Sequence, residues 1–179
     1  NYNNNDTAMS KTKHCKRCGR TLSIEQFHRD KKSKDGRAFY CKECVSIMGK
    51  KYRDTPSGIY SGMKSRSKYY KNNRPNNYKP LKITEKDFIA WYVAEPKICA
   101  YCDIPEILLH RVDDALNNKI NRLSIDCKDN EVGYKIGNIV LACNRCNYMK
   151  SDVLSFEQMR YIGQTFLKPI WQSKLAEIQ

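Results

Sequence analysis

Eight cysteines of this sequence fall into four CxxC pairs. The pairs are Cys15/Cys18, Cys41/Cys44, Cys99/Cys102 and Cys143/Cys146. Two residues between thiolates let both sulfurs of a tight turn bind one ion, and two such pairs complete the tetrahedron that zinc prefers. Disulfides are the alternative, but CxxC pairs in a reducing compartment more often hold metal. The four pairs can combine in three ways, and the simplest chain path joins the first with the second and the third with the fourth. We therefore predict two structural Zn²⁺ ions per chain, with Cys127 left over.

An amide side chain, Asn147, directly follows the last of these cysteines, and a lone carboxylate, Asp126, lies seventeen residues before Cys143. One carboxylate and one amide oxygen, completed by water and phosphate oxygens, form a site suited to Mg²⁺ or Mn²⁺. Such an ion polarises a scissile phosphate and stabilises the leaving oxygen. In isolation Asp126 would be an ordinary strand-end carboxylate and Asn147 a helix cap. Their joint placement beside two CxxC pairs favours a catalytic cation site.

Two strands and a helix must bring these side chains together. The segment Arg122 to Cys127 alternates in polarity, and Asn138 to Ala142 is β-branched and apolar, so both predict strands. Gly133, Tyr134 and Gly137 predict a long turn between them, and helical character begins at Cys143. Zinc at the start of this helix would clamp it onto the hairpin and place Asp126 opposite Asn147.

Helices are expected on both sides of this unit. Thr84 and Asp87 have the spacing of an N-cap pair, which predicts a helix through Ala94. Ser155 and Gln158 predict a second helix, which we expect to bury an apolar stripe and to be interrupted at Pro169. The residues of this stripe are Phe156, Met159, Ile162 and Phe166.

The first two CxxC pairs lie in a small separate module, residues 13–53. Ser23 to Gln26 has capping-box spacing, so a helical turn is expected to pack Ile24 and Phe27 under the metal. The module has no evident catalytic group. Its role is either structural, or docking to DNA, or contact within a dimer.

The chain has 33 Lys and Arg against 19 Asp and Glu, a formal charge of +14, which favours a polyanionic partner. Basic residues interleave with tyrosines between the two modules, where a helix would present several of them to a phosphate backbone. The candidate DNA-binding residues are Lys64, Arg66, Lys68, Lys71 and Arg74, with Lys150 added from the site itself. A solvated helix face explains the same charge pattern.

The sequence disfavours a membrane protein and a secreted protein. No apolar run approaches the roughly 18 residues of a membrane-spanning helix, so no membrane association is expected. Residues 1–10 are polar and lack the apolar core of a signal peptide, which favours a disordered tail and a cytoplasmic protein.

An ordered set of residues resembles the HNH, or ββα-metal, nucleases. The matching residues are Ile125-Asp126, Gly133-Tyr134, Asn138, Leu141-Ala-Cys143, Cys146-Asn147 and Lys150-Ser151. The Cys99/Cys102 pair is similar to the zinc-containing subtype found among phage nucleases and restriction enzymes. The likeness extends to Ala90-Trp91-Tyr92 before the site and Ser155-Phe-Glu-Gln-Met159 after it, and so covers most of the chain.

The resemblance implies a small α+β fold with a zinc-stapled ββα-metal core, an N-terminal four-cysteine zinc module and flanking helices. It divides the chain into a disordered tail (1–12), the zinc module (13–53), a basic DNA-contacting segment and linker (54–80), the nuclease core (81–168) and a C-terminal helix (169–179). Asp126 and Asn147 would hold the catalytic Mg²⁺ or Mn²⁺, Asn138 would shape the loop, and Lys150 would contact a phosphate.

The family usually has a histidine directly after the aspartate as general base, and Cys127 occupies that position here. In relatives that also lack this histidine, a tyrosine near the first knuckle is implicated, which corresponds to Tyr101. We therefore rank Tyr101 first as the proton acceptor, His110 second and Cys127 last.

The function implied is metal-dependent hydrolysis of phosphodiester bonds in double-stranded DNA. A sequence-specific, restriction-like homodimer is expected. Homing or phage endonucleases are alternatives within the enzyme class. Outside it, the chain would be an inactive zinc-dependent DNA-binding protein or would act on RNA.

Overall fold

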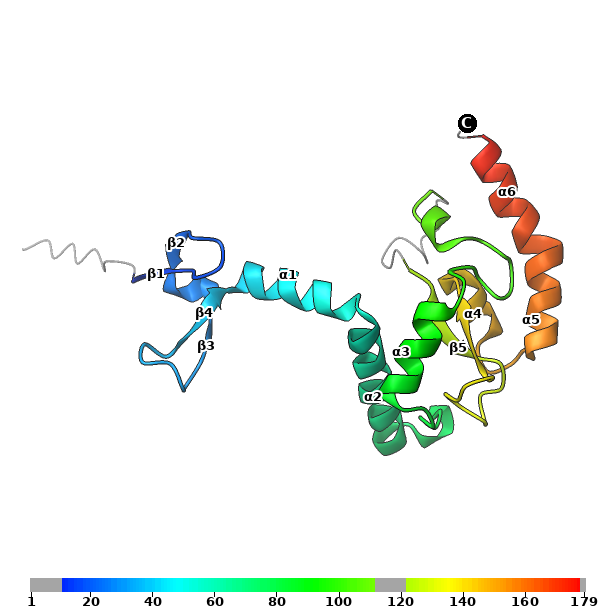
Figure 1. The fold of residues 1–179 in the computed structure, drawn as a ribbon, viewed down its shortest axis with the longest axis horizontal. Coiled ribbons are helices and arrows are strands. Elements are labelled where there is room, and N and C mark those ends of the chain that lie inside the picture. The colour runs from blue at the N-terminus through cyan, green and yellow to red at the C-terminus, as the bar shows by residue number, and fades with distance from the viewer. Residues whose placement is uncertain (1–10, 112–121, 178–179) are drawn as a thin grey trace, which may run out of the picture. The chain divides into compact units, whose positions relative to one another are not determined.

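The computed structural model describes residues 11–111 and 122–177 (Figure 1). The chain divides into two compact units, Asn1–Gly58 (unit 1) and Ile59–Gln179 (unit 2). Most of the tail expected at residues 1–12 lies outside the described residues. Among the helices of the described ranges, none combines the length and apolarity needed to cross a membrane.

Unit 1 consists of two antiparallel hairpins followed by a helix. Strand β1 (Thr12–His14) pairs with β2 (Thr21–Ser23), β3 (Phe27–Arg29) pairs with β4 (Arg37–Cys41), and α1 spans Lys42–Arg53. The predicted helical turn is present as a single 3₁₀ turn, Ile24–Gln26. Phe27 is fully buried against the cysteines, as predicted, whereas Leu22 packs on this cluster in the place expected for Ile24. The small core of unit 1 is therefore built around its four cysteines.

Unit 2 begins along α2 (Pro56–Asn73), whose buried face is marked by Ile59, Met63 and Ser67 at intervals of four residues. A 3₁₀ turn, Pro75–Asn77, follows, and then α3 (Glu85–Ala94). The predicted cap of α3 is confirmed, because the Thr84 side chain accepts a hydrogen bond from the Asp87 backbone amide. Phe88 and Tyr92 bury the inner face of α3.

The predicted strand-loop-strand-helix unit is confirmed. Strand β5 (Ser124–Cys127) pairs antiparallel with β6 (Ile139–Ala142), with Asp126 opposite Val140. Helix α4 (Asn144–Lys150) starts directly after Cys143, whose sulfur accepts the Cys146 amide as an N-cap. All four residues of β6 are buried, which explains why its sequence is apolar without alternation.

A short 3₁₀ turn, Glu106–Leu108, lies between α3 and β5. The C-terminal helices form one continuous run, which consists of α5 (Phe156–Ile162), a π-helical segment (Gly163–Leu167) and α6 (Lys168–Ala176). The capping box at Ser155 is confirmed. The expected break at Pro169 is wrong. Proline removes one helical N–H, and here it directly follows a wider π turn in which the regular bonding pattern has already changed.

The π segment also explains a second error. Phe166, predicted in the buried stripe, is 56% exposed, and Leu167 is buried at 8% instead. A π turn holds more residues per turn than an α turn, so it rotates every later side chain around the helix axis.

Candidate active site

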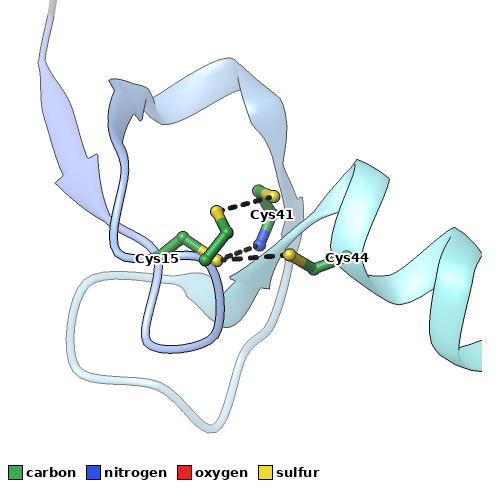
Figure 2. Close-up of side chains that lie close together, drawn as sticks. Cys15, Cys41 and Cys44 are labelled. Atoms are coloured by element: carbon green, nitrogen blue, oxygen red, sulfur yellow. Dashed lines mark hydrogen bonds between the residues drawn. The ribbon is translucent and has the colours of Figure 1, made fainter.

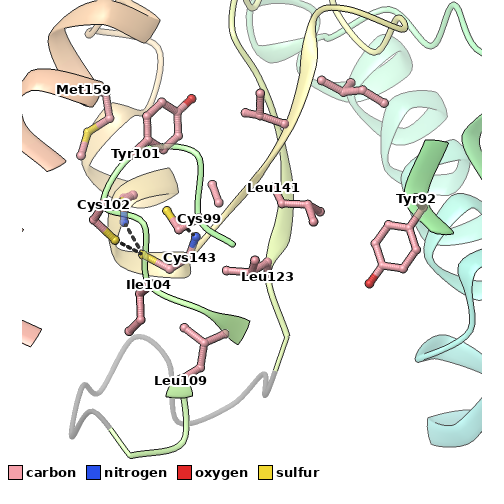
Figure 3. Packing of buried hydrophobic residues seen from close by; sticks show 14 of the residues in the cluster. Tyr92, Cys99, Tyr101, Cys102, Ile104, Leu109, Leu123, Leu141, Cys143 and Met159 are labelled. Atoms are coloured by element: carbon pink, nitrogen blue, oxygen red, sulfur yellow. Dashed lines mark hydrogen bonds between the residues drawn. The ribbon is translucent and has the colours of Figure 1, made fainter. Parts of the chain in front are cut away.

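Both predicted cysteine sets assemble in space, with the sulfurs of each set within 4.8 Å of one another. The Sγ–Sγ distances of the pairs Cys15–Cys44 and Cys102–Cys143 are both 3.9 Å, and that of Cys18–Cys41 is 4.0 Å (Figures 2 and 3). Sulfurs arranged tetrahedrally at about 2.3 Å from zinc lie about 3.8 Å apart, which these values approach. The predicted pairing of the CxxC motifs is therefore confirmed, and the residues fit zinc.

Backbone amides support the sulfurs in the same way in both sets. The Cys41 amide donates to Cys15 Sγ at 3.3 Å, and the Cys143 amide donates to Cys99 Sγ at 3.3 Å. In each case a residue of the second CxxC pair binds a sulfur of the first pair. Such bonds favour the thiolate, which is the form that coordinates metal.

Asp126 is only 2% exposed, and both of its oxygens have partners. Its Oδ2 accepts a hydrogen bond from the Tyr101 hydroxyl at 2.7 Å, and its Oδ1 accepts the Cys127 amide at 2.8 Å. Two ammonium groups are near: Lys150 Nζ lies 3.7 Å from Oδ2, and Lys79 Nζ lies 3.7 Å from Oδ1. Each oxygen of this buried group therefore has one hydrogen-bond donor and one ammonium group beside it.

Asn147 is fixed on α4 by the neighbouring strand. Its Nδ2 donates to Ser124 Oγ at 3.0 Å, and this hydroxyl donates in turn to the Ala142 carbonyl at 2.9 Å. Because side chains alternate along a strand, Ser124 and Asp126 belong to the same face of β5. The hydrogen bond orients the Asn147 amide without using its oxygen.

Asp126 and Asn147 line one cleft of about 300 Å³. Helix α2 contributes Arg66, Ser67 and Tyr70 to its wall. The other lining residues are Asn76, Asn77, Tyr78, Lys79, Ile125, Asn130, Tyr134, Ser151 and Asp152. Four amide groups, two cations and two carboxylates of the described residues line the cleft, so it offers both hydrogen bonds and positive charge to a ligand.

The loop between β5 and β6 is held by Asn138. Its Nδ2 donates to the carbonyls of Asp129 and Gly133, each at 2.7 Å, and its Oδ1 accepts the Asp129 amide at 3.1 Å. Gly133 has φ +75°, and a Cβ there would lie 2.4 Å from the Pro80 carbonyl oxygen. The Tyr134 amide also donates to this oxygen at 2.7 Å, so the loop is tied to residues 80–82.

Comparison with solved structures gives a match over nearly the whole molecule. It is the rare-cutting HNH restriction endonuclease PacI, whose study describes DNA perturbation by that enzyme. The match has a TM-score of 0.50 and 24% sequence identity, and covers 90% of this chain and 96% of that one. The chain has the HNH fold. No protein-family model and no curated protein matches the sequence.

The expected proton acceptors occupy different environments. Tyr101 is fully buried, its ring 5.4 Å from that of Phe156, and burial together with the charge of Asp126 raises the pKa of its phenol. Burial raises the pKa of the Cys127 thiol, at the usual histidine position of the HNH motif, to about 12. His110 is exposed and is not among the described residues that line the cleft. Of these three candidates, Tyr101 is the one whose side chain donates a hydrogen bond to Asp126.

The first knuckle of the HNH core, residues 99–103, is held from behind by the C-terminal helices. Gln164 Nε2 donates to the Tyr101 carbonyl at 2.7 Å, and Trp171 Nε1 donates to the Cys102 carbonyl at 3.0 Å. Arg160 and Lys168 each form an ion pair with Asp103 at 2.8 Å. The backbone that presents Tyr101 to Asp126 is thereby fixed.

The expected DNA-contacting residues do not all lie together. Arg66 lines the cleft, whereas Lys64, Lys68, Lys71 and Arg74 are exposed but are not among its described lining residues. Lys150, expected at a phosphate, is 1% exposed and lies beside Asp126, because α4 turns this side chain inward. Its expected contact with a DNA phosphate stays a prediction.

Sequence reasoning also missed residues of the cleft. Lys79 and Asn130 lie in segments interpreted as a linker and a loop, and neither has a motif or spacing that would single it out. Ser124, which orients Asn147, lies two residues before Asp126 on β5, so strand alternation could have indicated it.

Proposed function

We propose that this protein is a divalent-metal-dependent endonuclease that hydrolyses phosphodiester bonds in double-stranded DNA. One observation carries the proposal. A buried carboxylate (Asp126) and a fixed amide (Asn147) line one polar cleft, on the strand and helix of a ββα unit beside a four-cysteine site. The HNH fold supports the same reaction class.

The cleft offers the oxygen donors that Mg²⁺ or Mn²⁺ takes. Besides Asp126 and Asn147, it contains Asn130, whose buried Oδ1 has no hydrogen-bond partner among the described residues. An oxygen without a partner is costly unless a cation, a water or a donor from the substrate binds it. A bound cation would supply Lewis-acid stabilisation of the phosphate, with Asp126 and Asn147 as its protein ligands.

The chain's own residues prepare the site before a substrate arrives. Tyr101 and Lys150 hold Oδ2 of Asp126, and Ser124 holds the amide of Asn147. Asn138 fixes the loop beside them. Dipoles and charges fixed in advance need no reorganisation during reaction, which is a main source of catalytic rate.

We assign Tyr101 a positioning role in this reaction. It would accept a proton only after losing its own, and burial beside Asp126 opposes that loss. His110 and Cys127 stay alternatives to be tested by substitution.

The net charge of +14 and the exposed cations of α2 support duplex DNA as the partner. A restriction-like, sequence-specific homodimer is the finer form of the proposal, by analogy with PacI.

The test uses purified, zinc-loaded protein with supercoiled plasmid and Mg²⁺ or Mn²⁺. We expect metal-dependent nicking or linearisation that EDTA stops, and its loss in Asp126→Ala and Asn147→Ala while the zinc content stays unchanged. If wild type binds duplex DNA but never nicks it under any metal, the protein is a zinc-dependent DNA-binding protein and the enzymatic proposal fails. If RNA alone is cut, the substrate assignment fails.

A further inference from the structure

Lys79 shares Asp126 with Lys150, but the two ammonium groups differ in access. Lys150 lies by Oδ2 with a side chain 1% exposed. Lys79 lies by Oδ1 with a side chain 27% exposed, and it lines the cleft. Lys150 therefore compensates the buried carboxylate, whereas a ligand in the cleft can reach Lys79.

The backbone at Lys79 is held from two sides of the cleft. On one side, Ser67 Oγ of α2 donates to the Lys79 carbonyl at 3.1 Å. On the other side, the Tyr134 amide donates to the Pro80 carbonyl at 2.7 Å, and Gly133 lies so close to Pro80 that no side chain fits. A lysine on a free linker would have no such anchors. The cation is held at the mouth of the site by the elements that form the cleft.

We propose that Lys79 binds a non-bridging oxygen of the phosphate that is cleaved. The inference rests on the proposed endonuclease activity and adds a substrate-contacting residue to it. Negative charge shifts onto the phosphate oxygens as the bond breaks, so an ammonium fixed beside them interacts more strongly with the transition state than with bound substrate. Arg66, on α2, lines the same cleft and would attract the phosphates next to the scissile one in the DNA backbone.

The first experiment compares Lys79→Met, which keeps the aliphatic stem, with Lys79→Arg and with Lys82→Met. Lys82 is exposed, has the same charge and is not among the described residues that line the cleft. Under single-turnover conditions at saturating protein, we expect Lys79→Met to cleave roughly 10²-fold more slowly, the effect of removing one fixed donor to a developing charge. Lys79→Arg should recover part of the rate, and Lys82→Met should cleave as wild type.

The second experiment measures binding without the catalytic metal, so that it does not depend on activity. A duplex containing a mapped cleavage site is made with a neutral methylphosphonate at the scissile position. In buffer without added Mg²⁺ or Mn²⁺, we expect this change to weaken binding by the zinc-loaded wild type roughly tenfold, as for loss of one charge-assisted hydrogen bond. Binding by Lys79→Met should be insensitive to the change.

The outcomes separate the two proposals. If Lys79→Met and wild type lose equal affinity on neutralisation, or cleave at equal rates while Asp126→Ala is inactive, Lys79 is only a counter-ion of Asp126 and the inference is overturned. If Asp126→Ala cleaves like wild type, the proposed active site itself fails. Zinc content and thermal unfolding verify that each variant is folded, and Lys79→Arg tests the inference should Lys79→Met not fold.

Discussion

The Tyr101 hydroxyl makes a short hydrogen bond to a carboxylate that is almost completely buried. A hydrogen bond to a charged group contributes about 1.5–3 kcal/mol, and its loss leaves part of the carboxylate unsatisfied. We expect Tyr101→Phe, which keeps the ring against Phe156, to slow single-turnover cleavage roughly 10- to 100-fold. The shape of the pH–rate profile should stay the same, because a neutral donor does not titrate between pH 6 and 9.

The pH profile makes this prediction specific. If Tyr101 were the proton acceptor, its removal would abolish the rising limb of the profile. Full activity of Tyr101→Phe together with loss of activity in His110→Ala would assign the base to His110 instead.

Substitution of Cys127 tests directly whether the residue at the usual histidine position takes part in catalysis. Its pKa, raised to about 12 by burial, leaves the thiol protonated and neutral at any pH well below 12. We therefore expect Cys127→Ala to cleave within about threefold of wild type, with the same pH optimum, since no proton-transfer group is lost. A missing limb in the pH profile of this variant would show that the thiolate takes part.

Residue types and spacing were sufficient to predict Asp126, Asn147 and both zinc sets, because metal chemistry restricts these positions strongly. They were insufficient for the two lysines. Whether a lysine near a helix end is exposed or buried depends on how the helix is rotated against the strand, which no local pattern encodes. For this reason the burial of Lys150 beside Asp126 was not predicted, and Lys79 was missed because no pattern marks the loop in which it lies.

At the scale of elements, the π segment determines how closely the C-terminal run approaches the knuckle. A Cβ on Gly163 would lie 2.4 Å from the Tyr101 carbonyl oxygen, too close for any real contact. We expect Gly163→Ala to destabilise unit 2 by about 1–3 kcal/mol, the usual cost of overpacking, and to slow cleavage because Tyr101 shifts. Thermal unfolding and single-turnover rates measure both effects.

Gly62→Ala on α2 is the matched control. No atom lies within 4 Å of its added Cβ, and alanine favours a helix over glycine by about 0.5–1 kcal/mol. This variant should be at least as stable as wild type. Equal destabilisation of the two variants would mean that the contact with Tyr101 is unimportant.

The strands and caps of the core were predictable because each depends on a local pattern, such as the apolar run of β6 or the Ser155 capping box. The π segment was not. It begins at Gly163, which packs against the distant Tyr101 backbone, so neither the exposure of Phe166 nor the unbroken helix at Pro169 could be derived from periodicity.

At the scale of the molecule, each unit has its own cysteine set at its core. Metal binding to such sites supplies folding free energy, so the two units should lose structure separately. We expect two zinc ions per wild-type chain and one in both Cys44→Ser and Cys146→Ser, measured by elemental analysis. In Cys44→Ser the amides of β6 should keep their protection from hydrogen exchange.

In Cys146→Ser we expect unit 2 to lose its structure and unit 1 to keep it. The β6 amides should exchange freely while unit 1 keeps its zinc, and cleavage should be lost with the core that presents Asp126. Unfolding of both units in either variant would contradict the division of the chain at residue 58.

The bonds from Gln164 and Trp171 to the knuckle backbone have a consequence for biosynthesis. A ribosome releases Asp126, Asn147 and every cysteine of both sets before it releases these two residues. We therefore expect a nascent chain to be able to collect its zinc first, and to fix Tyr101 against Asp126 only after Gln164 and Trp171 have emerged. Until then, the backbone that presents Tyr101 would lack these two hydrogen bonds.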